Sequence, residues 1–225
     1  MLNSIAENIW EYNHPLKLAG MDIGHRMTVI RLNKNELFIH SPVPLDDTLF
    51  NELKSLGRVS AIIAPSRMHD LFLMPYFKRY PQAQFYCAPG LAEEHPQLPF
   101  TAELSLEKNY FWNKEIQQLI IHGMQKVNEV VFLHSSSGSL IVADLVFNLG
   151  RDNSLLTNGY LFLASAYRKT TPSRLFKLLI KDKQAMKLSI EIMLLWDFDR
   201  LIMGQGDIVN NSAKDALRKA YAWLL

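Results

Sequence analysis

Cysteine is almost absent from this chain of 225 residues, which contains only Cys87. A single cysteine forms no disulfide within the chain, and a zinc site built from cysteines needs several thiolates in one fold. The sequence therefore excludes a disulfide-stabilised domain. Any metal site in this protein has to rely mainly on histidine and carboxylate ligands.

An excess of one charge is also absent, because 24 Lys and Arg residues are balanced by 22 Asp and Glu residues, a net charge of +2. A net charge this small does not favour binding to the phosphate backbone of a nucleic acid. The hydrophobic share of 48% and the charged share of 20% are typical of a globular protein and exclude a disordered one. We therefore expect a folded protein with no nucleic-acid partner.

Long hydrophobic runs are missing as well. The most apolar stretch, residues 155–167, is shorter than the roughly 20 residues that a membrane-spanning helix needs. Residues 1–10 are largely polar and contain Glu7, so they lack the basic start and apolar core of a secretory signal. We expect no transmembrane segment and a cytoplasmic location.

What the sequence does contain is an alternation of short strands and helices. The apolar pattern predicts strands at 16–18, 27–32, 36–40, 59–64, 84–87, 116–122, 129–134, 140–144 and 200–203. It predicts helices at 46–56, 69–79, 155–167, 173–180, 183–196 and 213–225, with an irregular tract at 88–113. No linker rich in Gly, Ser or Pro and no repeat divides the chain. Residues 1–225 are therefore interpreted as one domain, with two packed sheets between helical layers.

Three predicted loops gather functional side chains at the ends of apolar strands, at 64–71, 132–139 and 203–207. His69 and Asp70 lie in the first loop, His134 begins the second, and Asp144 closes the strand that follows it. Imidazole and carboxylate bind zinc, iron or manganese where thiolates are absent. Whether the ends of these strands meet depends on the strand order, which the sequence leaves open.

Each of these residues also has an ordinary structural interpretation. A histidine at a strand end is often a hydrogen-bonded core or surface residue, and Asp144 suits a turn. Asp70 suits the first turn of a helix, where its charge favours the helix dipole. The 203–207 loop lacks the Lys-Ser/Thr that completes a phosphate loop. The three serines at 135–137 suggest a nucleophile, but no G-x-S-x-G elbow is present, so the sequence does not favour serine catalysis.

The order of the three loops resembles that of the metallo-β-lactamase superfamily. In that superfamily one apolar strand ends in T-H-x-H-x-D-H, a later strand ends in His before a Ser/Gly turn, the next ends in G-D-T and the last in G-H-G. The segments 24–32, 39–44 and 64–69 are also similar to an uncharacterised family of such proteins. The resemblance covers residues 15–207. It implies an α/β fold, a four-layer αββα sandwich of the metallo-β-lactamase type with extra C-terminal helices.

The resemblance carries over only part of the superfamily's ligand set. Asp70 falls on the Asp of the first motif, His134 on the His before the Ser/Gly turn and Asp144 on the bridging Asp. Three histidines of the first motif and the histidine of the last one are replaced, by Ser66, Met68, Leu71 and Gln205. His69 is displaced by one position and substitutes for a ligand only if the loop backbone shifts.

By this resemblance, the metal ligands are His69, Asp70, His134 and Asp144, and the catalytic residues are Asp70 and His134. The protein then binds one zinc, iron or manganese ion, or none. One hypothesis is a metal-dependent hydrolase that acts on a small molecule through a metal-bound water. The other is a non-catalytic binding or assembly module, which forms a homo-oligomer through apolar helices such as 183–196. The sequence does not identify a substrate, because a fold alone does not define one.

Overall fold

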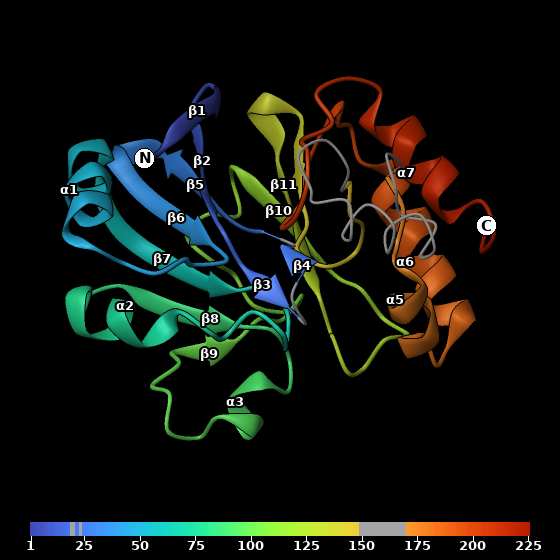
Figure 1. The fold of residues 1–225 in the computed structure, drawn as a ribbon, viewed down its shortest axis with the longest axis horizontal. Helices are drawn as coiled ribbons and strands as arrows, with labels where there is room; N and C mark the ends of the chain where they lie inside the picture. Colours follow the sequence, from blue (N-terminus) through green and yellow to red (C-terminus); the bar gives the residue numbers. More distant parts are fainter. Residues whose placement is uncertain (19–20, 23, 149–169) are drawn as a thin grey trace.

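The computed structural model describes residues 1–18, 21–22, 24–148 and 170–225. Two β-sheets lie face to face at the centre, and helices cover the outer face of each sheet (Figure 1). The arrangement is a four-layer αββα sandwich, which confirms the fold class expected from the sequence. The helix predicted at 155–167 lies outside the described residues.

The first sheet has seven strands in the order β1-β2-β5-β6-β7-β8-β9. Its strands are antiparallel from β1 to β6 and parallel from β6 to β9. Their bounds are Asn3–Ala6, Ile9–His14, His25–Leu32, Glu36–His40, Arg58–Ala64, Gln84–Cys87 and Ala102–Glu103. A small separate hairpin pairs β3 (Lys17–Leu18) with β4 (Met21–Asp22).

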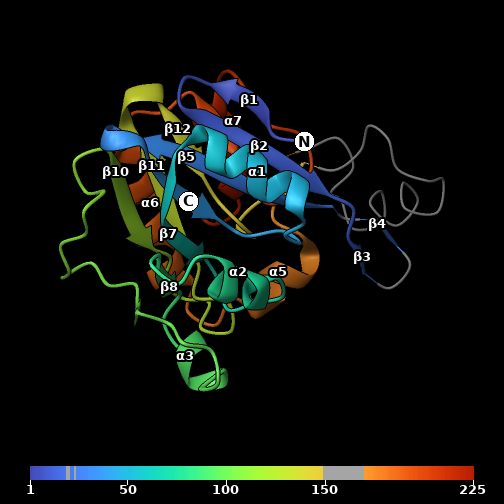
Figure 2. The same cartoon turned by 90° about the vertical axis from the view of Figure 1, so that its left-hand side faces the viewer.

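Helices α1 (Asp47–Leu56) and α2 (Leu73–Arg79) pack on the outer face of this sheet, and the short α3 (Leu91–Glu94) lies beyond β8 (Figure 2). Helix α2 begins four residues later than predicted. Proline is tolerated in the first turn of a helix but not in its interior, so Pro75 requires the helix to begin just before it. Residues 66–70 consequently remain in a loop.

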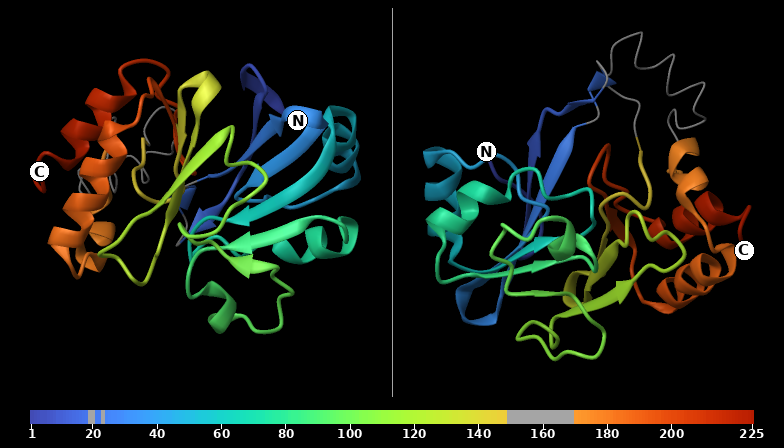
Figure 3. Two further views of the ribbon diagram at one scale, coloured as in Figure 1. Left: turned by 180° about the vertical axis from the view of Figure 1, so that it is seen from behind. Right: turned by 90° about the horizontal axis from the view of Figure 1, so that it is seen from below.

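The second sheet has four strands in the order β10-β11-β12-β13, and helices α5, α6 and α7 cover its outer face (Figure 3). The pairs β10–β11 and β11–β12 are antiparallel, and β12–β13 is parallel. The strands span Ile116–Ile120, Val130–His134, Ser139–Ile141 and Arg200–Ile202, and the helices span Arg174–Leu179, Lys183–Leu195 and Ala213–Tyr221. Strand β12 ends earlier than predicted, so Asp144 lies in the loop that follows it.

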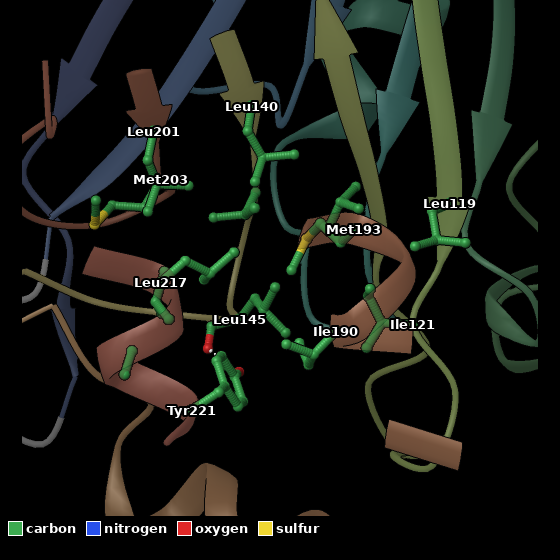
Figure 4. Packing of buried hydrophobic residues seen from close by; sticks show 14 of the residues in the cluster. Leu119, Ile121, Leu140, Leu145, Ile190, Met193, Leu201, Met203, Leu217 and Tyr221 are labelled. Atoms are coloured by element: carbon green, nitrogen blue, oxygen red, sulfur yellow. Dashed lines mark hydrogen bonds between the residues drawn. The ribbon is translucent and has the colours of Figure 1, made fainter. Parts of the chain in front are cut away.

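The hydrophobic core has three parts: one between the two sheets and one under each helical layer. Figure 4 shows the part beneath α6 and α7, which includes Ile190 of α6, Leu217 of α7 and Leu140 of β12. The Tyr221 hydroxyl donates to the carbonyl oxygen of Leu145 at 2.7 Å, which ties α7 to the loop after β12. Among the described helices, none is both long and apolar enough to cross a membrane.

Candidate functional site

The first of the three candidate loops brings His69 next to Asp144. His69 Nε2 lies 3.2 Å from Asp144 Oδ1, and Ser66 Oγ donates to Asp144 Oδ2 at 2.6 Å. All three residues are buried. Ser66 and His69 follow strand β7 of the first sheet, whereas Asp144 follows β12 of the second. The contact therefore joins the loops of the two sheets.

Asp70 does not take part in this contact. Its carboxylate faces His95, at the end of α3, with Asp70 Oδ2 3.1 Å from His95 Nε2. Both side chains are about one third exposed, at 29% and 32%. The structure therefore contains a second His–Asp pair that is closely similar in distance but far more accessible to water.

His134 is also separate from Asp144, because β11 and β12 form an antiparallel hairpin. His134 pairs with Ser139 at the turn, whereas Asp144 follows the far end of β12. The ring of His134 is bonded to two serines of that turn, with Nδ1 2.8 Å from Ser137 Oγ and Nε2 3.2 Å from Ser136 Oγ. It lines a cavity of about 860 Å³ that neither His69 nor Asp144 lines. Of the four predicted ligands, only His69 and Asp144 come together.

Two residues that the sequence analysis did not single out complete the cluster around His69. Ser41 follows the end of β6, and its Oγ lies 2.6 Å from His69 Nδ1 and 3.0 Å from His25 Nε2. His25 begins β5, and its Nε2 also lies 3.1 Å from the carbonyl oxygen of Pro42. Because β5 and β6 are antiparallel, the start of one strand lies beside the end of the other.

We call the linked side chains of His25, Ser41, Ser66, His69 and Asp144 the site network. Each of these residues is at most 6% exposed. In such a low-dielectric environment hydrogen bonds and charge interactions are stronger than in water, and an unpaired polar group is costly. The network is therefore a well-defined polar cluster inside an otherwise hydrophobic fold.

The charges within the network are concentrated on one pair. Burial opposes the charged form of His69, but the adjacent Asp144 carboxylate outweighs burial and raises the pKa of His69. Burial likewise opposes ionisation of Asp144, but His69 and the Ser66 hydrogen bond lower its pKa. The pKa of His25 falls to about 3 through burial and the nearby His69, so His25 stays neutral. The structure thus favours one ion pair beside a neutral imidazole.

Glu129, which precedes β11, supports the Asp144 loop. Its two carboxylate oxygens accept the backbone N–H groups of Ala143 at 2.6 Å and of Asp144 at 2.9 Å. Glu129 has no exposed surface, and burial together with the Asp144 charge raises its pKa to about 8. The antiparallel hairpin of β11 and β12 that separates His134 from Asp144 also places Glu129 next to Asp144.

The third candidate loop, 203–207, is held by a buried arginine. The guanidinium of Arg26 donates to the carbonyl oxygens of Met203 and Gly206, each at 2.6 Å, and to the Glu11 carboxylate at 2.6 Å. Gln205, at the position of the last motif histidine, is buried within this loop. The loop is thus closely tied to the first sheet.

The donor atoms of the site network decide whether it fits a metal ion. Both carboxylate oxygens of Asp144 and both ring nitrogens of His69 are already hydrogen-bonded inside the network. His40 differs, because both of its buried ring nitrogens lack a hydrogen-bond partner among the described residues. In the described part of the chain, however, no group of three or more His, Cys, Asp or Glu side chains is placed to hold a metal. These residues, as arranged, do not fit the single zinc, iron or manganese ion that the resemblance implies.

Comparison with solved structures defines the class of fold. The metallo-β-lactamase DIM-1, in a structure exposed to ceftazidime, aligns with a TM-score of 0.69 and 16% identity over 100% of this chain and 97% of that one. A metallo-β-lactamase from Pontibacter korlensis aligns with a TM-score of 0.69 and 11% identity, over 100% and 98% of the two chains. The mono-zinc form of FIM-1 from Pseudomonas aeruginosa gives 0.66 and 10%, over 100% and 96%. The protein has the metallo-β-lactamase fold.

The family model named domain of unknown function, DUF4336, matches residues 6–161, and the chain belongs to that family. No curated protein matches the sequence. The protein is therefore a divergent member of the metallo-β-lactamase fold, as the order of its loops predicted.

Proposed function

We propose that this protein is a hydrolase of small molecules whose reduced site is centred on His69 and Asp144. The observation that carries the proposal is the buried contact of 3.2 Å between His69 Nε2 and Asp144 Oδ1, made between loops of the two sheets. A buried imidazole–carboxylate pair is a common device for moving a proton, because the carboxylate orients the ring and stabilises its charged form.

The surrounding residues support proton transfer at this pair. Asp144, which accepts a hydrogen bond from Ser66, contacts Nε2 of His69, and Ser41 contacts the other ring nitrogen, Nδ1. Nδ1 is therefore the atom that takes up or gives back a proton during reaction. Burial of the network excludes water from the pair and strengthens its electrostatic interactions.

The test is hydrolysis by the purified full chain of a panel of carboxylic esters, thioesters, amides, β-lactams and phosphate esters. We expect turnover of at least one class, with a loss of at least about 100-fold in His69→Asn, as is usual for removal of a general base. His95→Asn is the matched control, because it changes the exposed His–Asp pair instead. No turnover across the panel, or equal turnover in His69→Asn, overturns the proposal.

The same assay tests the metal hypothesis. Samples are treated with a chelator and then resupplied with zinc, manganese or iron, and bound metal is measured for each. Because the donor atoms of His69 and Asp144 are engaged with each other and with serines, we expect turnover to survive chelation. Turnover that appears only with one bound ion per chain, and that is lost in Asp144→Asn, would re-establish the metal-dependent hydrolase.

A further inference from the structure

Ser41 occupies a special position in the site network, since it is the neighbour of His69 on the side away from Asp144. Its Oγ lies 2.6 Å from His69 Nδ1, and the opposite nitrogen of the same ring lies 3.2 Å from Asp144 Oδ1. The three side chains come from the ends of β6, β7 and β12, so only the fold brings them together. A hydroxyl, an imidazole and a carboxylate in this order form the general arrangement that activates a serine.

In the ion pair with Asp144 both ring nitrogens of His69 carry hydrogens, so Nδ1 accepts the Ser41 proton only in the singly protonated form of the ring. A carboxylate only accepts, so His69 Nε2 carries the hydrogen that is shared with Asp144. The Pro42 carbonyl also only accepts, so Nε2 of the neutral His25 carries a hydrogen and donates. When His69 has a single proton, that proton is on Nε2 and faces Asp144. Nδ1 is then free of hydrogen and accepts the hydrogen bond of the Ser41 hydroxyl.

The backbone at Ser41 has the strain that accompanies many nucleophiles. Its φ of 58° is in the left-handed region, which residues other than glycine seldom adopt. The conformation is held by the Ser41 N–H, which donates to the carbonyl oxygen of Ile63 at 3.0 Å. Ser41 shares two features with the serine of a nucleophile elbow, its place directly after a strand and its positive φ, although helix α1 begins only at Asp47. The glycines of the usual motif are replaced here by Ile39 and Val43, so the motif is not visible in the sequence.

We propose that Ser41 is the nucleophile of this site and that the substrates are acyl compounds, namely esters, thioesters or amides. This inference rests on the proposed function and names its reaction class. Ser41 Oγ forms a bond to the acyl carbon and its proton passes to His69 Nδ1. The bond between the acyl carbon and the leaving group breaks, and the alcohol, thiol or amine departs with that proton. Water then bonds to the acyl carbon and gives a proton to His69 Nδ1; the bond from the acyl carbon to Oγ breaks, the acid departs and the proton returns to Ser41 Oγ.

The test is covalent capture of Ser41 with phenylmethanesulfonyl fluoride and with diisopropyl fluorophosphate. Both probes are small, which suits a serine with no exposed surface in the structure. Each reaction joins Ser41 Oγ to sulfur or phosphorus and releases fluoride, and the proton passes to His69. We expect one adduct per chain in the intact mass and its location on Ser41 by peptide mapping. This measurement needs no variant, so a folding defect cannot obscure it.

The chain supplies its own comparison in a second serine–histidine pair. Ser137 Oγ lies 2.8 Å from His134 Nδ1, but the other ring nitrogen faces Ser136 rather than a carboxylate. We expect Ser137 to remain unlabelled and Ser137→Ala to label at Ser41 at the wild-type rate. His69→Asn should slow labelling of Ser41 at least about 100-fold, because the base is lost. Circular dichroism verifies that each variant is folded.

The outcomes separate this inference from the proposed function. An adduct on Ser41 that depends on His69 supports the inference. Hydrolysis that depends on His69 without any Ser41 adduct leaves the proposed function intact and overturns Ser41 as nucleophile. An adduct confined to Ser137, or equal labelling of Ser41 in His69→Asn, also overturns it. A Ser41 adduct without turnover of the panel retains the reactive serine and rejects hydrolysis of those substrates.

Discussion

Replacement of Glu129 by Gln tests the electrostatics that hold the Asp144 loop. The Glu129 carboxyl group is buried and accepts two backbone N–H groups, and its pKa is raised from 4.5 to about 8 by burial and by Asp144. Between these two pH values the unfolded chain has released the proton while the folded chain still holds it. The free energy of unfolding therefore falls as the pH rises from about 4.5 to about 8.

The size of this effect follows from the pKa difference. One pKa unit corresponds to about 1.4 kcal/mol, so a shift from 4.5 to about 8 amounts to at most about 5 kcal/mol. Gln cannot ionise, but the NH2 of its amide is a donor and accepts no hydrogen bond from the second backbone N–H. The loss of that bond lowers the free energy of unfolding by about 1–2 kcal/mol. Glu129→Gln should therefore be less stable than the wild type at pH 4.5 and more stable at pH 8.

The assay is urea unfolding at pH values from 4.5 to 8.5, for the wild type, for Glu129→Gln and for the exposed control Glu107→Gln. We expect the stability curves of the wild type and Glu129→Gln to cross, and the curve of Glu107→Gln to follow the wild type. Parallel curves for the wild type and Glu129→Gln would refute the account of Glu129 as a carboxyl group that folding keeps protonated.

Three further substitutions test the supports of the site. Arg26→Met removes three hydrogen bonds of the buried guanidinium and should lower the free energy of unfolding, measured in urea, by about 3 kcal/mol. A decrease below about 1 kcal/mol would show that the 203–207 loop does not depend on Arg26. Tyr221→Phe removes the bond to Leu145 and should cost about 1 kcal/mol, with unchanged stability counting against that bond. Gly206→Ala places a Cβ 2.3 Å from a backbone carbonyl oxygen, at a φ of 89°. It should lower the melting temperature more than the control Gly24→Ala, where φ is 66° but no described atom outside the adjacent residues lies within 4 Å of the new Cβ; equal shifts would assign the whole effect to the positive φ.

Much of the layered fold was predictable because local patterns reflect burial. The alternation in 27–32 and 36–40, with turn-forming residues between, predicts the hairpin of β5 and β6 that the structure contains. The run at 59–64 is apolar except for Ser60 because β7 is a central strand with helices on one side and the second sheet on the other. The N-terminal pair β1 and β2 was not predicted, since half of its residues are polar and all except Ile9 are at least partly exposed.

The candidate site was less accessible to sequence reasoning. His69 and Asp144 were singled out, and the fold places them in contact. Ser41 and His25 were missed because neither lies in a recognisable motif. A signal was nevertheless present in the predicted hairpin of strands 27–32 and 36–40. His25 lies just before its first strand and Ser41 just after its second, so the two residues lie side by side at the open end of the hairpin. Glu129, directly before the apolar strand β11, offered a similar signal once that hairpin was known to be antiparallel.

The sequence alone determined most of the strands and helices, that a metal site could not be built from cysteines, and that the loops follow the order of the metallo-β-lactamase fold. Only the tertiary structure decided which loop residues meet. The antiparallel β11–β12 pair sends His134 to one end of the hairpin and Asp144 to the other, and the packing of two sheets brings Asp144 to His69 and Ser41. The physical reason is that burial patterns act over a few residues, whereas the direction and order of strands, which determine these contacts, depend on pairing between distant segments.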